Sequence, residues 1–242
     1  MIAAQASGVA LQRFRRLRQR RQFQLHQASG AETMANIKFY TNPMSRGQIV
    51  RWMLEEVGQP YDQHIIGYEV MHDDAYRAIN PMMKVPAIVH GGQTVTECAG
   101  IIAYLAEAFP EAGLAPREEE KAAYYRWLFF AAGPIEQAVT NKANGFEPTP
   151  EKGRMFGYGS YDLAVNTLAD HLAANAYVCG DRFTAADVYV GSQALWGTQF
   201  GTLPSLQPFL DYGTRLSGRE AYQRAKAIDG QLIADMQAAT TS

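Results

Sequence analysis

The sequence predicts two domains, an α/β domain with the element order βαβ then ββα, followed by an all-helical domain. Strand-like and helix-like runs alternate between residues 35 and 110, and a short segment with proline and glycine follows them. From residue 117 onward no convincing strand pattern recurs. A chain of 242 residues is long enough for two small domains, and 47% hydrophobic with 19% charged residues is ordinary for a globular protein.

Residues 1–34 are expected to form a basic, disordered extension ahead of the first domain. Residues 1–33 hold six arginines and one acid, a net charge of +5, whereas the rest of the chain carries −7. Such a leader fits an organellar transit peptide or a membrane-surface or nucleic-acid arm. We favour an extension with no role, such as an upstream start that precedes a true start at Met34, because the family-like pattern begins just after it. The acidic body argues against nucleic acid as the main partner.

The first predicted elements form a βαβ unit. Residues 37–40 are typical of a strand and residues 41–44 of a turn, and a helix follows Ser45 with Gly58 as its stop. That helix carries its apolar side chains on one face, at Ile49, Val50, Met53, Leu54 and Val57. Residues 61–66 form a second strand, parallel to the first by the crossover rule. Residues 72–79 are expected to be a polar loop with one helical turn.

The stretch from residue 80 to residue 109 completes this domain. Residues 85–89 form a strand headed by Pro86, residues 90–93 a hairpin turn, and residues 94–95 a short return strand. Glu97 then opens a helix whose apolar residues recur at helical spacing up to Phe109. The resulting domain, residues 35–110, has the thioredoxin-like arrangement.

Two features of the stretch from residue 80 to residue 109 favour the binding of a ligand. A cis Val85–Pro86 bond would turn the chain and leave the backbone N–H and C=O of Val85 free to meet an extended peptide. The helix that starts at Glu97 offers unpaired N–H groups and a positive dipole end, which suit a carboxylate. From spacing alone, an ordinary hairpin packed on a helix remains the simpler interpretation.

At these residues the chain resembles the glutathione S-transferase family. The matching segments are Lys84–Val85–Pro86, where the family presents a cis-proline backbone to the cysteine of glutathione, and Thr96–Glu97–Cys98–Ala99, where Glu or Gln followed by Ser holds the γ-glutamyl end. The resemblance implies a glutathione site made by Lys84, Val85, Pro86, Glu97 and Cys98. Cys98 departs from the usual serine, which matters only if a hydroxyl rather than a backbone N–H binds the ligand.

The resemblance also implies the chemistry, in which the sulfur of glutathione attacks an electrophile. A free thiol titrates near ~8.5, so the protein must favour the thiolate, and a hydroxyl hydrogen bond can do this. Ser45, at the mouth of the first helix, is the first candidate, as in serine-type members; its alternative role is to cap that helix. Tyr40 is the rival, as in tyrosine-type members, and a non-catalytic site is the third possibility.

The second domain is expected to span residues 117–240, after a linker at 110–116. Residues 118–143 predict a long helix kinked at Gly133–Pro134, and residues 151–176 a further helix. The first of these helices carries an aromatic row that fits core, subunit interface or the wall of an apolar substrate pocket: Tyr124, Tyr125, Trp127, Phe129 and Phe130. Thr184 and Asp187 form a capping box, a structural motif.

We therefore expect a glutathione transferase, with glutathione as co-substrate and a small hydrophobic electrophile as partner. A glutathione-dependent isomerase or dehalogenase and a non-catalytic binding module are the alternatives. A homodimer is expected, because the aromatic helix needs more cover than one small domain supplies. No apolar run approaches the ~20 residues of a membrane span, and the two cysteines and five histidines form no metal-ligand pattern. A reducing cytoplasm fits this composition.

Overall fold

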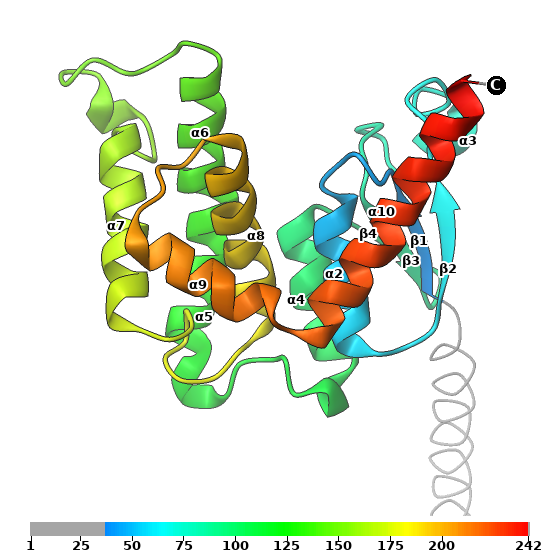
Figure 1. Cartoon of the computed structure of the whole chain (residues 1–242), viewed down its shortest axis with the longest axis horizontal. Coiled ribbons are helices and arrows are strands. Elements are labelled where there is room, and N and C mark those ends of the chain that lie inside the picture. Colours follow the sequence, from blue (N-terminus) through cyan, green and yellow to red (C-terminus); the bar gives the residue numbers. More distant parts are fainter. Residues whose placement is uncertain (1–36, 242) are drawn as a thin grey trace, which may run out of the picture.

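The computed structural model describes residues 37–241, which form an α/β domain and a helical domain side by side (Figure 1). The expected basic extension, residues 1–34, lies outside the described residues. The α/β domain holds a four-stranded sheet in the order β2-β1-β3-β4. Its strands are β1 (Ile37–Thr41), β2 (Tyr61–Ile65), β3 (Ala87–His90) and β4 (Gln93–Thr96). β1 pairs parallel with β2, while the β1–β3 and β3–β4 pairs are antiparallel. This is the predicted thioredoxin-like order.

Two helices, α2 (Gly47–Val57) and α4 (Cys98–Ala108), pack on this sheet, and the single turn α3 (Asp74–Arg77) lies in the loop before β3. Gly58 ends α2 as predicted: its φ is 72°, a left-handed conformation that glycine adopts without strain, and its N–H bonds Leu54 O. The hairpin between β3 and β4 turns at two glycines, Gly91 and Gly92, both with positive φ.

The helical domain contains the remaining long helices. They are α5 (Lys121–Phe130), α6 (Glu136–Ala143), α7 (Tyr161–Ala174), α8 (Ala185–Phe200), α9 (Gln207–Ser217) and α10 (Glu220–Thr241), with short 3₁₀ turns at Pro110–Ala112, Glu118–Glu120 and Gly153–Met155. A π-helical turn, Ala131–Ile135, contains Pro134 and joins α5 to α6, where the sequence predicted a kink. The capping box of Thr184 and Asp187 is present at the start of α8.

The prediction of a helix over residues 151–176 was wrong at its start. α7 begins only at Tyr161, after Ser160, whose side chain accepts a hydrogen bond from Leu163 N. Gly157 and Gly159 precede it, and Gly159 has a φ of 68°. Glycines lower helix propensity and the serine provides an N-cap, so the helix starts ten residues later than predicted.

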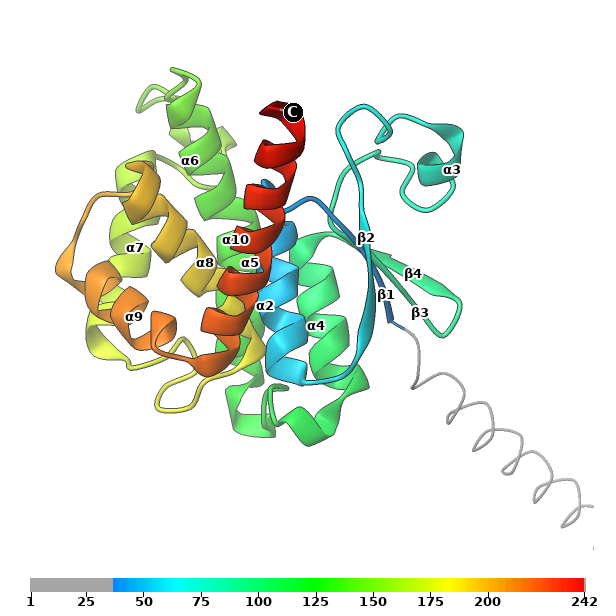
Figure 2. The same ribbon diagram turned by 45° about the vertical axis from the view of Figure 1, so that its right-hand side comes forward.

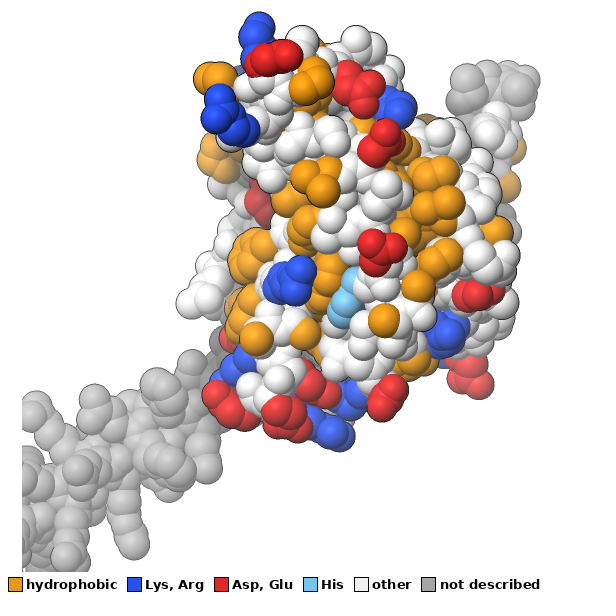
Figure 3. All heavy atoms as spheres, turned by 90° about the vertical axis from the view of Figure 1, so that its left-hand side faces the viewer, with side chains coloured by type: hydrophobic (Ala, Val, Ile, Leu, Met, Phe, Trp, Pro, Cys, Tyr) orange, Lys and Arg blue, Asp and Glu red, His pale blue; other side chains and the backbone are white. Residues whose placement is uncertain are grey.

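The last helix returns to the first domain. α10 packs along α2, and α8 contacts both α2 and α4, so the two domains share one continuous hydrophobic core (Figure 2). On the side of the molecule formed by the helical domain, hydrophobic side chains lie in several patches separated by charged and other polar groups (Figure 3). Within residues 37–241, no helix is long and apolar enough to cross a membrane.

Candidate active site

Two cavities meet at the interface of the two domains, and Arg46 lines both of them. The first, the peptide cavity, has a volume of about 310 Å³ and is lined by Asn80, Lys84, Val85, Pro86, Glu97, Cys98, Ala99, Ala132, Glu136 and Tyr189 besides Arg46. The structure therefore brings together all five residues that the sequence assigned to the glutathione site. The second, the apolar cavity, has a volume of about 550 Å³ and is lined by residues that include Met44, Ser45, Gln48, Trp196, Phe200 and Lys226.

The backbone edge at Val85 has the predicted form. The Val85–Pro86 bond is cis. The loop before this peptide bond is held in place by two hydrogen bonds, because Asn80 Nδ2 and the Tyr76 hydroxyl each donate to Lys84 O at 2.7 Å. Among residues 37–241, no loop backbone group or side chain hydrogen-bonds the N–H or C=O of Val85. Both groups stay available to an extended peptide in the cavity.

The start of α4 forms the other side of the peptide cavity. Glu97 is the N-cap of α4 and has φ 65° and ψ 123°, which is rare for a non-glycine residue and turns the chain sharply from β4 into the helix. Its side chain is exposed at the cavity, and no acidic residue lies in the first turn of the helix. The N–H groups of that turn, with the positive end of the helix dipole, therefore suit a carboxylate.

Cys98 is buried although it borders the cavity, with 8% of its surface exposed. Its Sγ lies 3.7 Å from Arg46 O, to which the thiol donates. Burial raises the pKa of the Cys98 thiol to about 12, so it stays protonated at neutral pH. Cys98 thus acts as a small packing residue at the helix start. A reactive cysteine has a lowered thiol pKa, whereas the pKa of Cys98 is raised.

Ser45 sits at the border of the apolar cavity, one residue before the N-cap of α2, which is Arg46. Its hydroxyl donates to Asn42 O at 2.7 Å and accepts from Gly47 N at 3.0 Å. The hydroxyl thus supports the turn that leads into the helix, close to the capping role considered from the sequence. Ser45 is half-buried and lines the cavity, and rotation about its Cβ–Oγ bond can redirect the O–H donor.

Tyr40, the alternative hydroxyl, lies elsewhere. Its ring stacks on His64 with centroids 4.8 Å apart and tilts against Tyr76 at 6.1 Å. The neighbouring Phe39 faces the opposite side of the sheet, where Arg51 of α2 lies over its ring. Tyr40 lines neither the peptide cavity nor the apolar cavity.

Arg46 was considered from the sequence as a source of positive charge that is more simply explained as a solvated side chain, whereas the contacts it makes could not be predicted. Arg46 forms an ion pair with Glu136 of α6, which links the mouth of α2 to the helical domain across the two cavities. Gln193 Nε2 donates to the other oxygen of Glu136 at 2.8 Å. Because these contacts join residues 90 and 57 positions apart in the sequence, only the packing of the helices reveals them.

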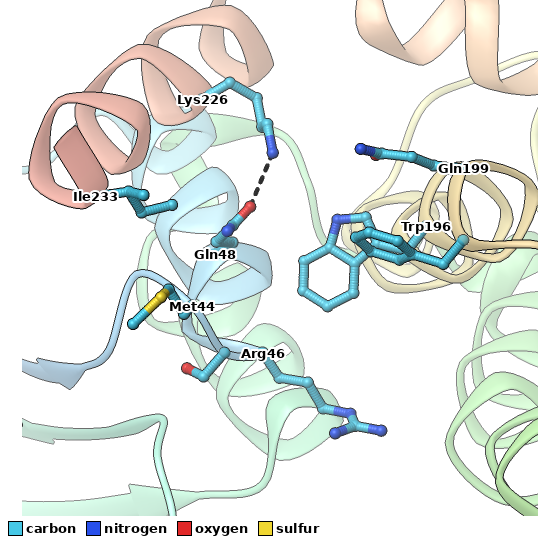
Figure 4. A pocket seen from close by; sticks show the side chains of 9 residues that line it. Met44, Arg46, Gln48, Trp196, Gln199, Lys226 and Ile233 are labelled. Carbon is cyan, nitrogen blue, oxygen red and sulfur yellow. Dashed lines mark hydrogen bonds between the residues drawn. The ribbon is translucent and has the colours of Figure 1, made fainter. Parts of the chain in front are cut away.

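The apolar cavity has a different aromatic wall from the one predicted. Tyr124 and Trp127 of α5 are buried in the core, and none of the aromatic residues of α5 lines either cavity. The aromatic side chains of the cavity come from Trp196 and Phe200 of α8. Opposite them, Lys226 of α10 donates to Gln48 Oε1 at 2.8 Å (Figure 4). Within residues 37–241, no cluster of three or more His, Cys, Asp or Glu side chains could hold a metal ion.

The fold and the cleft define a class of two-domain proteins, in which a thioredoxin-like domain presents a cis-proline edge and a helix start to a cleft closed by a helical domain. Residues 39–113 match the family model of the glutathione S-transferase N-terminal domain. The chain is 27% identical over 162 residues to glutathione S-transferase GstA of Escherichia coli O157:H7, across 65% of this chain and 79% of that protein. The N-terminal domain of this chain therefore belongs to the glutathione S-transferase family.

Two further similarities bear on the function. Maleylacetoacetate isomerase of Rattus norvegicus is 27% identical over 158 residues, across 62% of this chain and 71% of that protein. Among solved structures, the theta class glutathione S-transferase of Xanthomonas axonopodis pv. citri, with glutathione bound, is 26% identical with a TM-score of 0.61. That match covers 78% of this chain and 96% of the other.

Proposed function

We propose that this protein is a glutathione transferase, which binds glutathione in the peptide cavity and activates its thiol for attack on an electrophile in the apolar cavity. The observation that carries the proposal is the juxtaposition of a free backbone edge at Val85, the start of α4 at Glu97 and an adjoining apolar cavity. The peptide site and the electrophile site meet at Arg46, so two ligands bound there would be in contact.

In this proposal, the cysteinyl part of glutathione pairs with the backbone of Val85 as an added strand. Its γ-glutamyl carboxylate binds the N–H groups at Cys98 and Ala99, and its amino group binds the Glu97 carboxylate. Lys84, which is exposed at the cavity and forms no ion pair within residues 37–241, is placed to bind the other carboxylate. The amino group and one carboxylate of the tripeptide then each have a side chain of opposite charge, and the γ-glutamyl carboxylate has the N–H groups at the positive end of the α4 dipole.

Ser45 is the proposed donor to the thiolate. Its hydroxyl rotates away from Asn42 O and donates to the sulfur, while it keeps the hydrogen bond that it accepts from Gly47 N. Accepting a hydrogen bond polarises the hydroxyl and makes it a better donor. Stabilising the thiolate lowers the thiol pKa, so that a larger fraction is ionised at neutral pH. The sulfur then attacks the electrophilic carbon without any nucleophile from the protein.

The test is a panel of electrophiles assayed with and without glutathione, after retention of the protein on immobilised glutathione has been measured. A transferase binds the matrix and forms a thioether at a rate above the uncatalysed reaction. Failure to bind the matrix would contradict the glutathione site itself. Binding without turnover of any electrophile would instead support the non-catalytic module.

An isomerase is the second candidate, because maleylacetoacetate isomerases are among the similar proteins. In such a reaction the thiolate adds to a conjugated cis double bond, the new single bond rotates, and elimination returns the thiol with the trans product. The two candidates differ in glutathione consumption. A conjugation lowers the free thiol concentration in step with product, whereas an isomerisation leaves it unchanged.

A further inference from the structure

The charges around the apolar cavity are all of one sign. Of its nine lining residues, Arg46 and Lys226 are cations and none is an acid. Arg46 is already neutralised by its ion pair with Glu136. Lys226 forms no ion pair with any residue from 37 to 241. The cavity that receives the electrophile therefore holds one positive charge that has no ion-pair partner among residues 37–241.

The position of Lys226 is defined by neighbouring residues. Its Nζ donates to Gln48 Oε1 at 2.8 Å, and Gln48 Nε2 in turn donates to Pro43 O at 2.6 Å, which fixes the amide so that its oxygen faces the lysine. An ammonium group has three N–H donors, and this contact uses one of them. Asp229, one turn further along α10, is buried and forms its ion pair with Arg51 rather than with Lys226. Burial raises the pKa of this carboxyl group, although the positive charge of Lys226 acts to lower it.

Trp196 gives the cavity a flat apolar surface. Its indole projects from α8 into the cavity, with Lys226 and Arg46 on either side of it in the close view (Figure 4). The ring is half-buried, and Phe200 beside it is 69% exposed. Flat conjugated molecules stack well on such surfaces, and a carboxylate on the molecule would find the ammonium group at the edge of the same cavity.

We propose that the electrophile of this cavity is a flat aromatic or conjugated compound that carries a carboxylate, with its ring on Trp196 and its acid group on Lys226. This inference rests on the proposed function. For a halogenated aromatic acid, the glutathione thiolate forms a carbon–sulfur bond, the carbon–halogen bond breaks, halide leaves and the thiol proton passes to solvent.

The first experiment measures binding without glutathione and without turnover. The tryptophan fluorescence of the protein is titrated with 4-nitrobenzoate and with nitrobenzene, which differ only in the carboxylate. Lys226→Met should lower the affinity for 4-nitrobenzoate relative to nitrobenzene about two- to fivefold, while Lys226→Arg should retain it. High salt should reduce the preference in the native protein.

Two controls accompany the titration. Trp196→Phe identifies the fluorescence signal, because Trp52 and Trp127 are buried and each is only 2% exposed. Lys152→Met removes an exposed lysine that does not line the cavity, and it should leave the preference as in the native protein. Circular dichroism and the melting temperature verify that each variant folds.

The second experiment compares 4-chloro-3,5-dinitrobenzoate with 1-chloro-2,4-dinitrobenzene as substrates in the presence of glutathione. The ratio of their kcat/KM values should fall about two- to fivefold in Lys226→Met, mainly through KM of the acid. A ratio that is the same in both proteins, or no preference for 4-nitrobenzoate in the titration, would overturn the inference. Binding of 4-nitrobenzoate that depends on Lys226, with no conjugation of either substrate, would support the anion site and contradict the transferase activity.

Discussion

Arg51 and Asp229 join the first helix of the α/β domain to the last helix of the chain. Arg51 Nε donates to Asp229 Oδ1 at 2.7 Å, and the two side chains are 1% and 2% exposed. Arg51 also donates to the Tyr61 hydroxyl at 3.0 Å and lies over the Phe39 ring. Its Nη2 and Asp229 Oδ2 are buried and lack a partner among the described residues. The pair therefore holds α10 against α2 without satisfying all of its own polar atoms.

Removing one member of this pair should destabilise the protein strongly. Asp229→Ala leaves the Arg51 charge buried and uncompensated, and we expect a loss of about 3–5 kcal/mol in the free energy of unfolding. The double variant Arg51→Met with Asp229→Leu removes both charges and should recover most of that loss, because the native pair is incompletely hydrogen-bonded. Urea unfolding of the three proteins measures this. A double variant as unstable as Asp229→Ala would contradict the explanation.

The ion pair of Glu120 and Arg182 should make stability depend on pH. Arg182 forms an ion pair with Glu120 and also donates to Gly113 O and Ala115 O. These hydrogen bonds connect the linker, residues 110–116, to the helical domain. The hydrogen bond from Arg182, with one from Arg117 N, lowers the pKa of Glu120 to about 2 from an ordinary 4.5. Because this pKa lies below its unfolded value, the stabilisation is fully present above about pH 5 and is lost as the pH falls toward 2.

Glu120→Gln should remove this part of the acid sensitivity. We expect the native protein to lose about 2–3 kcal/mol more than the variant between pH 5 and pH 2, at about 1.36 kcal/mol for each pKa unit. The matched control is Glu119→Gln, which neutralises the exposed neighbouring acid. Urea unfolding at a series of pH values measures the difference. Parallel stability curves for the native protein and Glu120→Gln would contradict the pairing.

A homodimer remains a prediction, and α5 is where we expect the partner. Phe129 and Tyr125 stack on this helix with centroids 6.5 Å apart, yet 63% and 38% of their surfaces are exposed. Two neighbouring exposed aromatic rings are typical of an interface. Light scattering at micromolar concentration should give about twice the chain mass of 26.8 kDa. Phe129→Glu should shift the mass toward the monomer, whereas Phe200→Glu, at an exposed phenylalanine of α8, should not.

The sequence was sufficient for the fold because its signals are local. Gly58, Pro86 and the capping box of Thr184 and Asp187 each impose a backbone conformation through their own chemistry, and all three features appear as predicted. The start of α7 was missed because the glycines before it and the Ser160 N-cap were not recognised as the start signals of that helix.

The candidate site was predictable only in part, for the same reason. The peptide cavity depends on consecutive residues around Pro86 and Glu97, so a motif could reveal it. The apolar cavity depends on Trp196 and Lys226, which come from helices that the sequence cannot place relative to α2. The aromatic row of α5 carried a stronger sequence pattern than Trp196, but that helix turns its rings toward the core and the outer surface.

The role of Ser45 leads to the last prediction, which concerns the bound thiol. A hydrogen bond to an ionised group contributes about 1.5–3 kcal/mol, so its loss should raise the thiol pKa of bound glutathione by roughly one to two units. Ser45→Ala should lower conjugation at neutral pH about ten- to a hundredfold, with glutathione affinity nearly unchanged and the rate–pH profile shifted upward. Ser45→Thr keeps a hydroxyl and should retain part of the activity.

Glu97→Ala should weaken glutathione binding with a smaller effect on the thiol pKa. Thiolate absorbance as a function of pH measures the pKa directly. If Tyr40→Phe shifts the profile and Ser45→Ala costs only the ~1 kcal/mol of a lost cap, the thiol is activated by Tyr40 and Ser45 serves the turn into α2.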